Sequence, residues 1–286
     1  MTANIMYGKP LATAIKQQAA QTLQQIKKNH SIQPNIATIL VGEDTGSQLY
    51  MRLRDKACKE VGITPVHHLM PKHTTTQELI DLIQVLNIDD SVHGILLQLP
   101  LPAHIPPDQV ISAIDPCKDV EGFTASNLGS IINGQERIVP CTPLAILKLL
   151  ESMQISIQGK HVVIINHSMV VGKPLSILFL NRNATVSICH EFTNNLEHIT
   201  QQADILITAA GRQHLITKQH IKKEAIVFDV AIIPTKQGVS GDVDLEDIID
   251  IAQAITPVPG GIGPVTVACA IENMVRIIQH QIGEPC

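Results

Sequence analysis

Apolar residues recur along the chain at two spacings, one typical of helices and one typical of buried strands. Residues 10–28 carry apolar side chains at helical intervals, which predicts an amphipathic helix. Short apolar runs that end at turn residues predict three strands, over 35–41, 64–70 and 94–99. The segments between them have helical lengths and predict helices over 47–61 and 76–86. This alternation indicates a parallel sheet covered by helices on both sides.

The alternation is interrupted by residues 115–143, which are rich in Pro, Gly, Asn and Asp, and we place a domain junction there. Beyond it the pattern predicts a compact Rossmann-like unit. Its expected strands cover 162–165, 184–188, 204–209 and 225–230, and its expected helices cover 143–153, 175–180 and 194–203. Residues 257–264 hold three prolines and three glycines, which predicts a stiff loop, and a terminal helix is expected over 265–281.

The stretch Gly159–Pro174, GKHVVIINHSMVVGKP, predicts a strand, a tight turn and a helix. Free backbone N–H groups and the positive end of the helix dipole make such a turn suited to a phosphate. However, Gly172 is the only glycine between strand and helix, and the spacing G-x-G-x-x-G is absent. An ordinary βα turn is therefore the first interpretation of the stretch alone, and the regular unit around it favours a dinucleotide.

Length and composition limit the classes of protein to consider. A chain of 286 residues with 44% hydrophobic content can build two cores. No apolar run reaches membrane-spanning length, and the segment MTANIMYGKPLATAIKQQ lacks a secretory signal, so we expect a cytoplasmic protein. The formal net charge of −5 without a basic block argues against nucleic acid as partner. Neither the histidines nor the cysteines have metal-ligand spacing; the cysteines are Cys58, Cys117, Cys141, Cys189, Cys269 and Cys286.

Seven motifs follow one another along the chain: YMRLRDKACKEVGI, GILLQLPLP, PCKDVEGF, PCTP, SMVVGKP, GDVD and ITPVPGGIGPVTV. With them the chain resembles, from end to end, the bifunctional methylenetetrahydrofolate dehydrogenase/methenyltetrahydrofolate cyclohydrolase family. The resemblance implies two α/β domains with a cleft between them, and a homodimer formed through the cofactor domains. The folate-binding domain would cover 1–139, completed by a helix over 265–286, and the NAD(P)-binding domain would cover 140–264.

The resemblance also implies a function. The protein would oxidise 5,10-methylenetetrahydrofolate with NADP and hydrolyse the product to 10-formyltetrahydrofolate, in the one-carbon metabolism that serves purine biosynthesis. Tyr50 and Arg54, four residues apart, project from the same helix face. Tyr50 would stack on the folate ring, Gln98 would orient the residue at position 54, and Glu121 would accept hydrogen bonds from the pterin. A core tyrosine and a strand-end cap are the alternatives for Tyr50 and Gln98.

Further residues are implied to hold the cofactor. Ser168 and the turn Gly172–Pro174 would bind the pyrophosphate, and Pro257–Gly261 would line the nicotinamide pocket. The nearby Lys118 and Asp119 are expected to face the cleft with Glu121. The complete set of cofactor-binding candidates is Asn166, His167, Ser168, Gly172, Lys173, Pro174, Glu191, Ile232, Pro257, Gly260 and Gly261.

The chain departs from the family pattern at several of these positions. Arg54 stands where the family has lysine, Glu121 where it has aspartate, and Asn166–His167 where it has Gly-Arg. The segment 229–233, DVAII, stands where the family has Asp-Val-Gly-Ile-Asn. Lys56 points about 200° away from Arg54 around the helix and is a poor substitute. Because arginine stays charged and exchanges no proton near neutral pH, we expect a cyclohydrolase step that is weak relative to the dehydrogenase step.

Two positions bear on the choice of cofactor. His167 replaces a cation that would face the ribose 2′-phosphate, and the carboxylate of Glu191 would repel that phosphate. NAD is therefore a possible cofactor beside the NADP implied by the resemblance, unless Glu191 points to solvent.

Three functions are compatible with these features. An active folate-interconverting enzyme is the main hypothesis. A folate- or nucleotide-binding paralogue with little or no turnover is the alternative, and ligand-induced thermal stabilisation without an absorbance change would reveal it. A Rossmann-type dehydrogenase for another substrate is the third, and a panel of hydroxy acids and folates would separate it.

Overall fold

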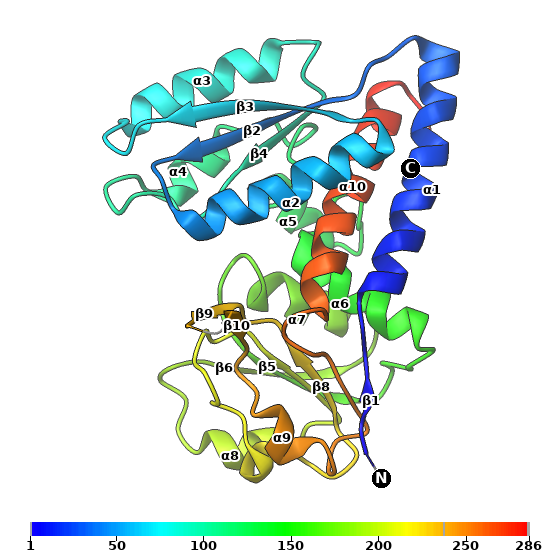
Figure 1. Ribbon diagram of the computed structural model, residues 1–286, viewed down its shortest axis with the longest axis vertical. Coiled ribbons are helices and arrows are strands. Elements are labelled where there is room, and N and C mark those ends of the chain that lie inside the picture. The colour runs from blue at the N-terminus through cyan, green and yellow to red at the C-terminus, as the bar shows by residue number, and fades with distance from the viewer. Residues whose placement is uncertain (1, 237, 285–286) are drawn as a thin grey trace. The chain divides into compact units, whose positions relative to one another are not determined.

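The computed structural model describes residues 2–236 and 238–284, without the side chain of Thr45. It contains two compact units, each built on its own parallel sheet (Figure 1). The three-stranded unit comprises residues 13–130, 135–141 and 267–284, and the six-stranded unit comprises residues 2–12, 131–134 and 142–266. The expected α/β class with two parallel sheets is confirmed.

In the three-stranded unit the strand order is β3–β2–β4, and all pairs are parallel. From the central strand β2 the chain passes through α2 to β3 on one side, and then through α3 to β4 on the other side. Right-handed crossovers therefore place α2 and α3 on opposite faces, as Figure 1 shows. The elements are β2 (Asn35–Val41), α2 (Thr45–Val61), β3 (Thr64–Met70), α3 (Thr76–Ile88), β4 (Gly94–Leu97) and α4 (Pro107–Ser112).

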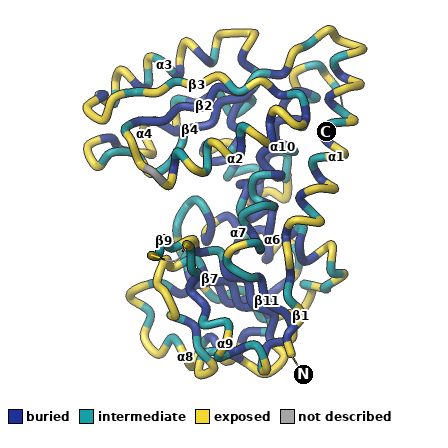
Figure 2. Tube along the Cα trace, in the orientation of Figure 1, coloured by how far each residue is buried: buried dark blue, intermediate teal, exposed yellow. Residues whose placement is uncertain are grey.

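Burial along these strands follows from their places in the sheet. The central β2 is buried at all positions but its first, whereas the edge strand β3 is exposed at four of its seven residues (Figure 2). The bounds predicted for both strands from the sequence are confirmed. Ile36 and Ile39 of β2 and Leu79 and Ile83 of α3 are all buried. Because side chains alternate along a strand, Ile36 and Ile39 lie on opposite faces of β2, so the sheet is covered on both sides.

In the six-stranded unit the order is β1–β11–β8–β7–β5–β6, again all parallel. Here too the order reverses, because β6 lies on one side of β5 and the next strand, β7, lies on the other. The strands are β1 (Asn4–Ile5), β5 (His161–Ile165), β6 (Thr185–Cys189), β7 (Ile205–Thr208), β8 (Ile226–Asp229) and β11 (Ala254–Ile255). The remaining elements are α7 (Gly172–Leu180), α8 (Leu196–Thr200), η1 (Lys218–His220), α9 (Leu245–Ile248) and the hairpin β9 (Ile233–Thr235) with β10 (Gly238–Ser240).

Four helices have residues in both units: α1 (Lys9–His30), α5 (Ala125–Ile132), α6 (Cys141–Ser152) and α10 (Ile262–Gln281). Within the three-stranded unit, the buried Asn273 of α10 donates to the carbonyl oxygens of Val120 and Val139, at 2.9 Å each. At the other end of the chain, β1 pairs with β11, so residues 2–12 belong to the six-stranded unit. The expected domain division, with residues 1–139 together, differs from the observed units, because residues 2–12 and 131–134 belong to the six-stranded unit.

Two predicted features are wrong. No helix was predicted within the segment 115–143, where we placed the domain junction, but the structure contains α5 there. The terminal helix begins at Ile262 rather than at 265, so it includes Pro264. Proline is tolerated there because the first turn of a helix leaves its N–H groups without intrahelical acceptors.

Lys118 and Asp119 have structural roles, which corrects the expectation that they face a ligand. Lys118 is 9% exposed, and its ammonium donates to the carbonyl oxygens of Leu86 at 3.0 Å and Asp89 at 2.8 Å, at the C-terminal end of α3. Asp119 is 2% exposed and accepts from the N–H groups of Gly122 at 2.9 Å and Thr124 at 2.8 Å. The first caps α3 and the second fixes the turn that carries Glu121.

None of the helices in residues 2–236 and 238–284 combines the length and hydropathy that a membrane span requires. The five cysteines in this range are free thiols, and only Cys117 among them is not buried. Cys286 lies outside the described residues.

Candidate active site

In the three-stranded unit the candidate catalytic residues follow the carboxyl ends of strands. Gln98 comes directly after β4, and α2, which carries Tyr50 and Arg54, follows β2. A parallel bridge between Ile95 and Asp119 extends the sheet beside β4, so Glu121 also emerges at this edge. Because the strand order reverses between β2 and β4, this edge has the crevice at which open α/β sheets bind ligands.

Arg54 is the centre of this group. Its side chain is 1% exposed, and its Nη2 donates to Oε1 of Gln98 at 3.3 Å. Its Cζ lies 5.8 Å from the centroid of the Tyr50 ring, within cation–π range. The Nε2 of Gln98 donates to the carbonyl oxygen of Leu99 at 3.1 Å, which turns the amide oxygen of Gln98 toward Arg54. Gln98 thus contacts Arg54 through its amide oxygen.

Arg54 and Glu121, the two charged residues of this cluster, do not form an ion pair with each other. The Nε of Arg54 is buried without a hydrogen-bond partner among the described residues. Within the same part of the chain, no ion pair joins Arg54 to Glu121. Burial raises the pKa of Glu121, the charge of Arg54 lowers it, and Asp119 raises it. Burial, followed by the charge of Glu121, also raises the pKa of Tyr50, so the phenol stays protonated.

Cys141 belongs to this cluster and was missed as a site residue. Its thiol is buried and donates to the carbonyl oxygen of Val120 at 3.6 Å. Burial, and then the charge of Glu121, raise the pKa of the thiol well above its ordinary value, which keeps it neutral. The motif PCTP contains Cys141, but the motif alone did not indicate that the thiol would lie beside Val120 and Glu121.

In the six-stranded unit the cofactor candidates also collect at one edge of the sheet. Parallel strands point their carboxyl ends to the same side, so residues that directly follow them come together. Asn166, His167, Ser168 and Gly172–Pro174 follow β5, Glu191 follows β6, Ile232 follows β8, and Pro257, Gly260 and Gly261 follow β11.

The turn after β5 is closely packed against α7. A Cβ on Gly172 would lie 2.0 Å from the carbonyl oxygen of Asn166, so this position accepts only glycine. The N–H of Gly172 donates to Oδ1 of Asn166 at 3.0 Å, and the N–H of Lys173 donates to the carbonyl oxygen of Ser168 at 3.0 Å. The expectation that the N–H groups at the start of this helix are free is therefore wrong for these two residues.

His167 and Glu191 lie together although they follow different strands. The Nδ1 of His167 is 3.8 Å from Oε2 of Glu191, and both side chains are exposed. The ring of His167 also meets the ring of His190 edge-on, with centroids 4.9 Å apart. A ligand at the end of β6 would therefore face one carboxylate and two imidazoles.

The loop after β11 is bonded to the short segment between β1 and α1. The N–H of Gly8 donates to the carbonyl oxygen of Gly260 at 2.9 Å, and the N–H of Gly261 donates to that of Pro257 at 2.8 Å. Gly260 has φ of +105°, a conformation that side chains other than glycine rarely adopt. Ile232 is 57% exposed near the start of α10, where it would meet a Cβ added to Gly263 at 3.9 Å.

Comparison with protein-family models matches residues 6–121 to the catalytic domain, and residues 140–282 to the NAD(P)-binding domain, of tetrahydrofolate dehydrogenase/cyclohydrolase. The chain belongs to this family. A relative, the bifunctional protein FolD of Methanosarcina barkeri, is 48% identical over 270 residues, which cover 94% of each chain.

Solved structures of family members have the same fold. The bifunctional FolD enzyme of Campylobacter jejuni matches with a TM-score of 0.94 and 42% identity, over 98% of this chain and 99% of that chain. The FolD of Trypanosoma brucei, determined with NADP cofactor and inhibitor, matches with a TM-score of 0.94 and 31% identity over 99% of both chains. The Arg54 cluster thus lies in the segment of the tetrahydrofolate dehydrogenase/cyclohydrolase catalytic domain, and the β5–α7 turn lies in that of the NAD(P)-binding domain.

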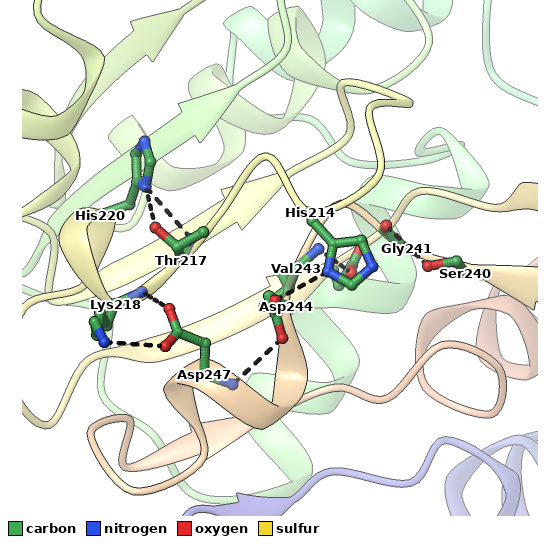
Figure 3. A network of polar contacts seen from close by, with 10 residues as sticks. His214, Thr217, Lys218, His220, Ser240, Gly241, Val243, Asp244 and Asp247 are labelled. Carbon is green, nitrogen blue, oxygen red and sulfur yellow. Dashed lines mark hydrogen bonds and ion pairs between the residues drawn. The ribbon is translucent and has the colours of Figure 1, made fainter.

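The GDVD motif of this family member holds the loops beneath the cofactor candidates. The buried Asp229 accepts from the N–H groups of Asp242 at 3.1 Å and Val243 at 2.9 Å, and a Cβ on Gly241 would lie 1.9 Å from its carboxylate. Figure 3 shows the continuation of the motif, in which Asp244 pairs with His214 at 3.1 Å and caps α9.

Asp229 gives this unit a measurable pH dependence. Burial raises its pKa to about 6, against its backbone hydrogen bonds, which lower it. The folded state therefore keeps a proton that the unfolded chain has released. The stability that this proton provides is complete below about pH 4 and is lost as the pH rises through about 6, which amounts to ~3 kcal/mol.

The check is the free energy of unfolding of wild type and Asp229→Asn by urea denaturation from pH 4 to 7. All other titrating groups are common to both proteins, so the difference between them isolates Asp229. We expect wild type to lose stability relative to Asp229→Asn as the pH rises. Parallel curves would mean that Asp229 has the same pKa in both states.

Proposed function

We propose that this protein oxidises 5,10-methylenetetrahydrofolate with NAD(P) and hydrolyses the product to 10-formyltetrahydrofolate. In the first step a hydride leaves the methylene carbon with its bonding pair. In the second, water adds to the methenyl carbon, the bond from this carbon to N5 breaks, N5 takes one proton of the water, and the other proton leaves to solvent. The observation that carries the proposal is the contact of Arg54 with both Gln98 and Tyr50 at the switch point of the family's catalytic domain.

The residues of the Arg54 cluster divide the work between binding and polarisation. Tyr50, a neutral phenol, offers its ring face to the planar part of the folate. Glu121 accepts hydrogen bonds from the pterin amino and ring nitrogens. Arg54 is buried and its Nε has no protein partner, so a small shift of the side chain on binding would let it polarise a substrate oxygen or nitrogen where no water screens its charge.

The six-stranded unit fits a dinucleotide, because its candidates lie on one edge and its glycines allow the backbone to approach a ligand closely. We assign the pyrophosphate to the turn 166–174, the adenosine ribose to His167 and Glu191, and the nicotinamide to Ile232 and the loop 257–261. The nicotinamide supplies the hydride acceptor. The relative from Trypanosoma brucei, determined with NADP, supports NADP as a cofactor of this chain.

The resemblance to the family supports three further assignments. Folate binds to the three-stranded unit and the dinucleotide to the six-stranded unit, with residues 2–12 contributing to the latter. The protein forms a homodimer through its cofactor domains. It acts in the cytoplasm, in the one-carbon metabolism that supplies purine biosynthesis.

Arg54 makes the two steps unequal. Hydride transfer depends on the positions of two bound rings, whereas hydrolysis also needs a group that moves a proton of water. Arginine cannot exchange a proton near neutral pH, and lysine in a buried site can. We therefore expect Arg54→Lys to raise the rate of methenyl hydrolysis about tenfold or more, out of the ~10²- to 10⁴-fold that acid–base catalysis typically supplies.

The measurement follows methenyl formation and methenyl hydrolysis by absorbance, above the buffer-catalysed background, for wild type and Arg54→Lys. Arg52→Lys is the matched control, because Arg52 is an exposed arginine of the same helix. Wild-type hydrolysis as fast as that of Arg54→Lys would show that arginine is an adequate replacement. Wild type without any methenyl formation, with either cofactor, would overturn the proposed function.

Glu191 weakens the binding of NADP and makes NAD a possible second cofactor. A 2′-phosphate at the end of β6 would face this carboxylate, which His167 pairs with only at 3.8 Å. We expect wild type to bind NADP no more tightly than NAD, and Glu191→Gln to tighten NADP about threefold to tenfold without changing NAD. Titration calorimetry measures both dissociation constants, with Glu197→Gln, an exposed glutamate of α8, as control. Tight NADP binding by wild type with no detectable NAD binding would contradict this assignment.

A further inference from the structure

The side-chain oxygen of Asn166 collects three hydrogen bonds from the turn after β5. It accepts from the N–H of Ser168 at 2.8 Å, from the hydroxyl of Ser168 at 2.7 Å and from the N–H of Gly172 at 3.0 Å. Two of these donors belong to the turn and the third to the first residue of α7. One amide oxygen therefore fixes the path of the chain from the strand to the helix.

The other end of the amide fixes the turn to the sheet. The Nδ2 of Asn166 donates to the carbonyl oxygen of Ala209 at 2.8 Å, directly after β7. This bond determines which end of the amide faces the turn, because only the nitrogen can donate. β5 and β7 are the neighbours between which the strand order reverses, so Asn166 sits at the place where a sheet of this kind binds its ligand.

These bonds decide which donors remain for a phosphate. The N–H of Val171 donates to the hydroxyl of Ser168 at 3.2 Å, those of Gly172 and Lys173 are also used, and Pro174 has none. The hydroxyl hydrogen of Ser168 is directed to Asn166. Among the described residues, the N–H groups of Met169 and Val170, in the middle of the turn, have no acceptor.

We propose that Asn166 is a positioning residue for the cofactor's pyrophosphate: it does not bind the phosphates itself, but holds the turn so that the N–H groups of Met169 and Val170 donate to them. This inference rests on the proposed function, since it takes the ligand to be a dinucleotide. A turn already held in its binding conformation loses little conformational entropy when the ligand arrives. Removal of the amide releases three donors and one acceptor, and the turn must then be ordered by the ligand.

The test is the affinity of Asn166→Ala for NAD and for NADP, measured by titration calorimetry on the full-length protein. The pyrophosphate is common to both cofactors, so both dissociation constants should rise by the same factor, about tenfold. Their ratio should not change, and the KM for each cofactor should rise by a larger factor than kcat falls. Asn181→Ala is the matched control, because Asn181 also donates its amide to a backbone carbonyl but lies at the other end of α7.

Other outcomes overturn the proposal. Unchanged or tighter binding by Asn166→Ala would mean that the amide is merely structural or occupies donors that the phosphate needs. A loss confined to NADP would place Asn166 at the ribose. If the alanine variant does not fold, Asn166→Ser keeps one acceptor, and both constants should rise by an equal, smaller factor. If wild type binds neither NAD nor NADP, the proposed function is overturned. If wild type binds both cofactors and the Asn166 variants bind them as tightly as wild type does, only this inference is overturned.

Discussion

The buried charge of Arg54 is the constraint on which the candidate active site depends. A guanidinium that is 1% exposed has lost its water and cannot release its proton, so the protein has to supply acceptors and opposite charge. Gln98 supplies the hydrogen-bond acceptor, and Glu121 supplies a carboxyl group whose pKa the charge of Arg54 lowers. Removal of a partner from a buried charge typically costs about 3–5 kcal/mol of stability. This cost constrains the relative positions of three segments: the end of β4, the helix α2 and the turn at Glu121. The same burial leaves the Nε of Arg54 without a hydrogen-bond partner among the described residues.

A reversal of strand order brings the functional residues together in each unit. In one sheet the reversal lies between β2 and β4, in the other between β5 and β7, and loops on both sides of it contribute side chains. Each unit also uses a buried carboxylate to hold the loops at that edge. Asp119 binds the backbone of the turn before α5, and Asp229 binds the backbone after β10. These carboxylates bind the backbone of loops at the edge where the candidate residues lie.

The sequence predicted what depends on local periodicity. The bounds of β2 and β3 and the shared helix face of Tyr50 and Arg54 were expected from it and are present. The contact of Gln98 with Arg54 was implied only by the family resemblance. It did not predict the pairing of β1 with β11, since a two-residue strand has no pattern of its own and its partner lies far away along the chain. The sequence also did not show that Lys118 has a structural role whereas Glu121 is a site candidate. Nor did it reveal the three hydrogen bonds that the side-chain oxygen of Asn166 accepts, because a hydrogen-bond partner depends on packing rather than on residue type.

The most direct test of this account is the distance from the Nε of Arg54 to the nearest polar atom of a bound folate, in a crystal structure of the protein with a folate substrate analogue and a dinucleotide. Because this nitrogen is buried without a protein partner, the account predicts that the side chain shifts on binding and that Nε donates to the folate at about 2.7–3.2 Å, with the bond from Nη2 to Gln98 retained. A folate bound elsewhere, or an Arg54 that turns to an ion pair with Glu121 and leaves the ligand untouched, would contradict it.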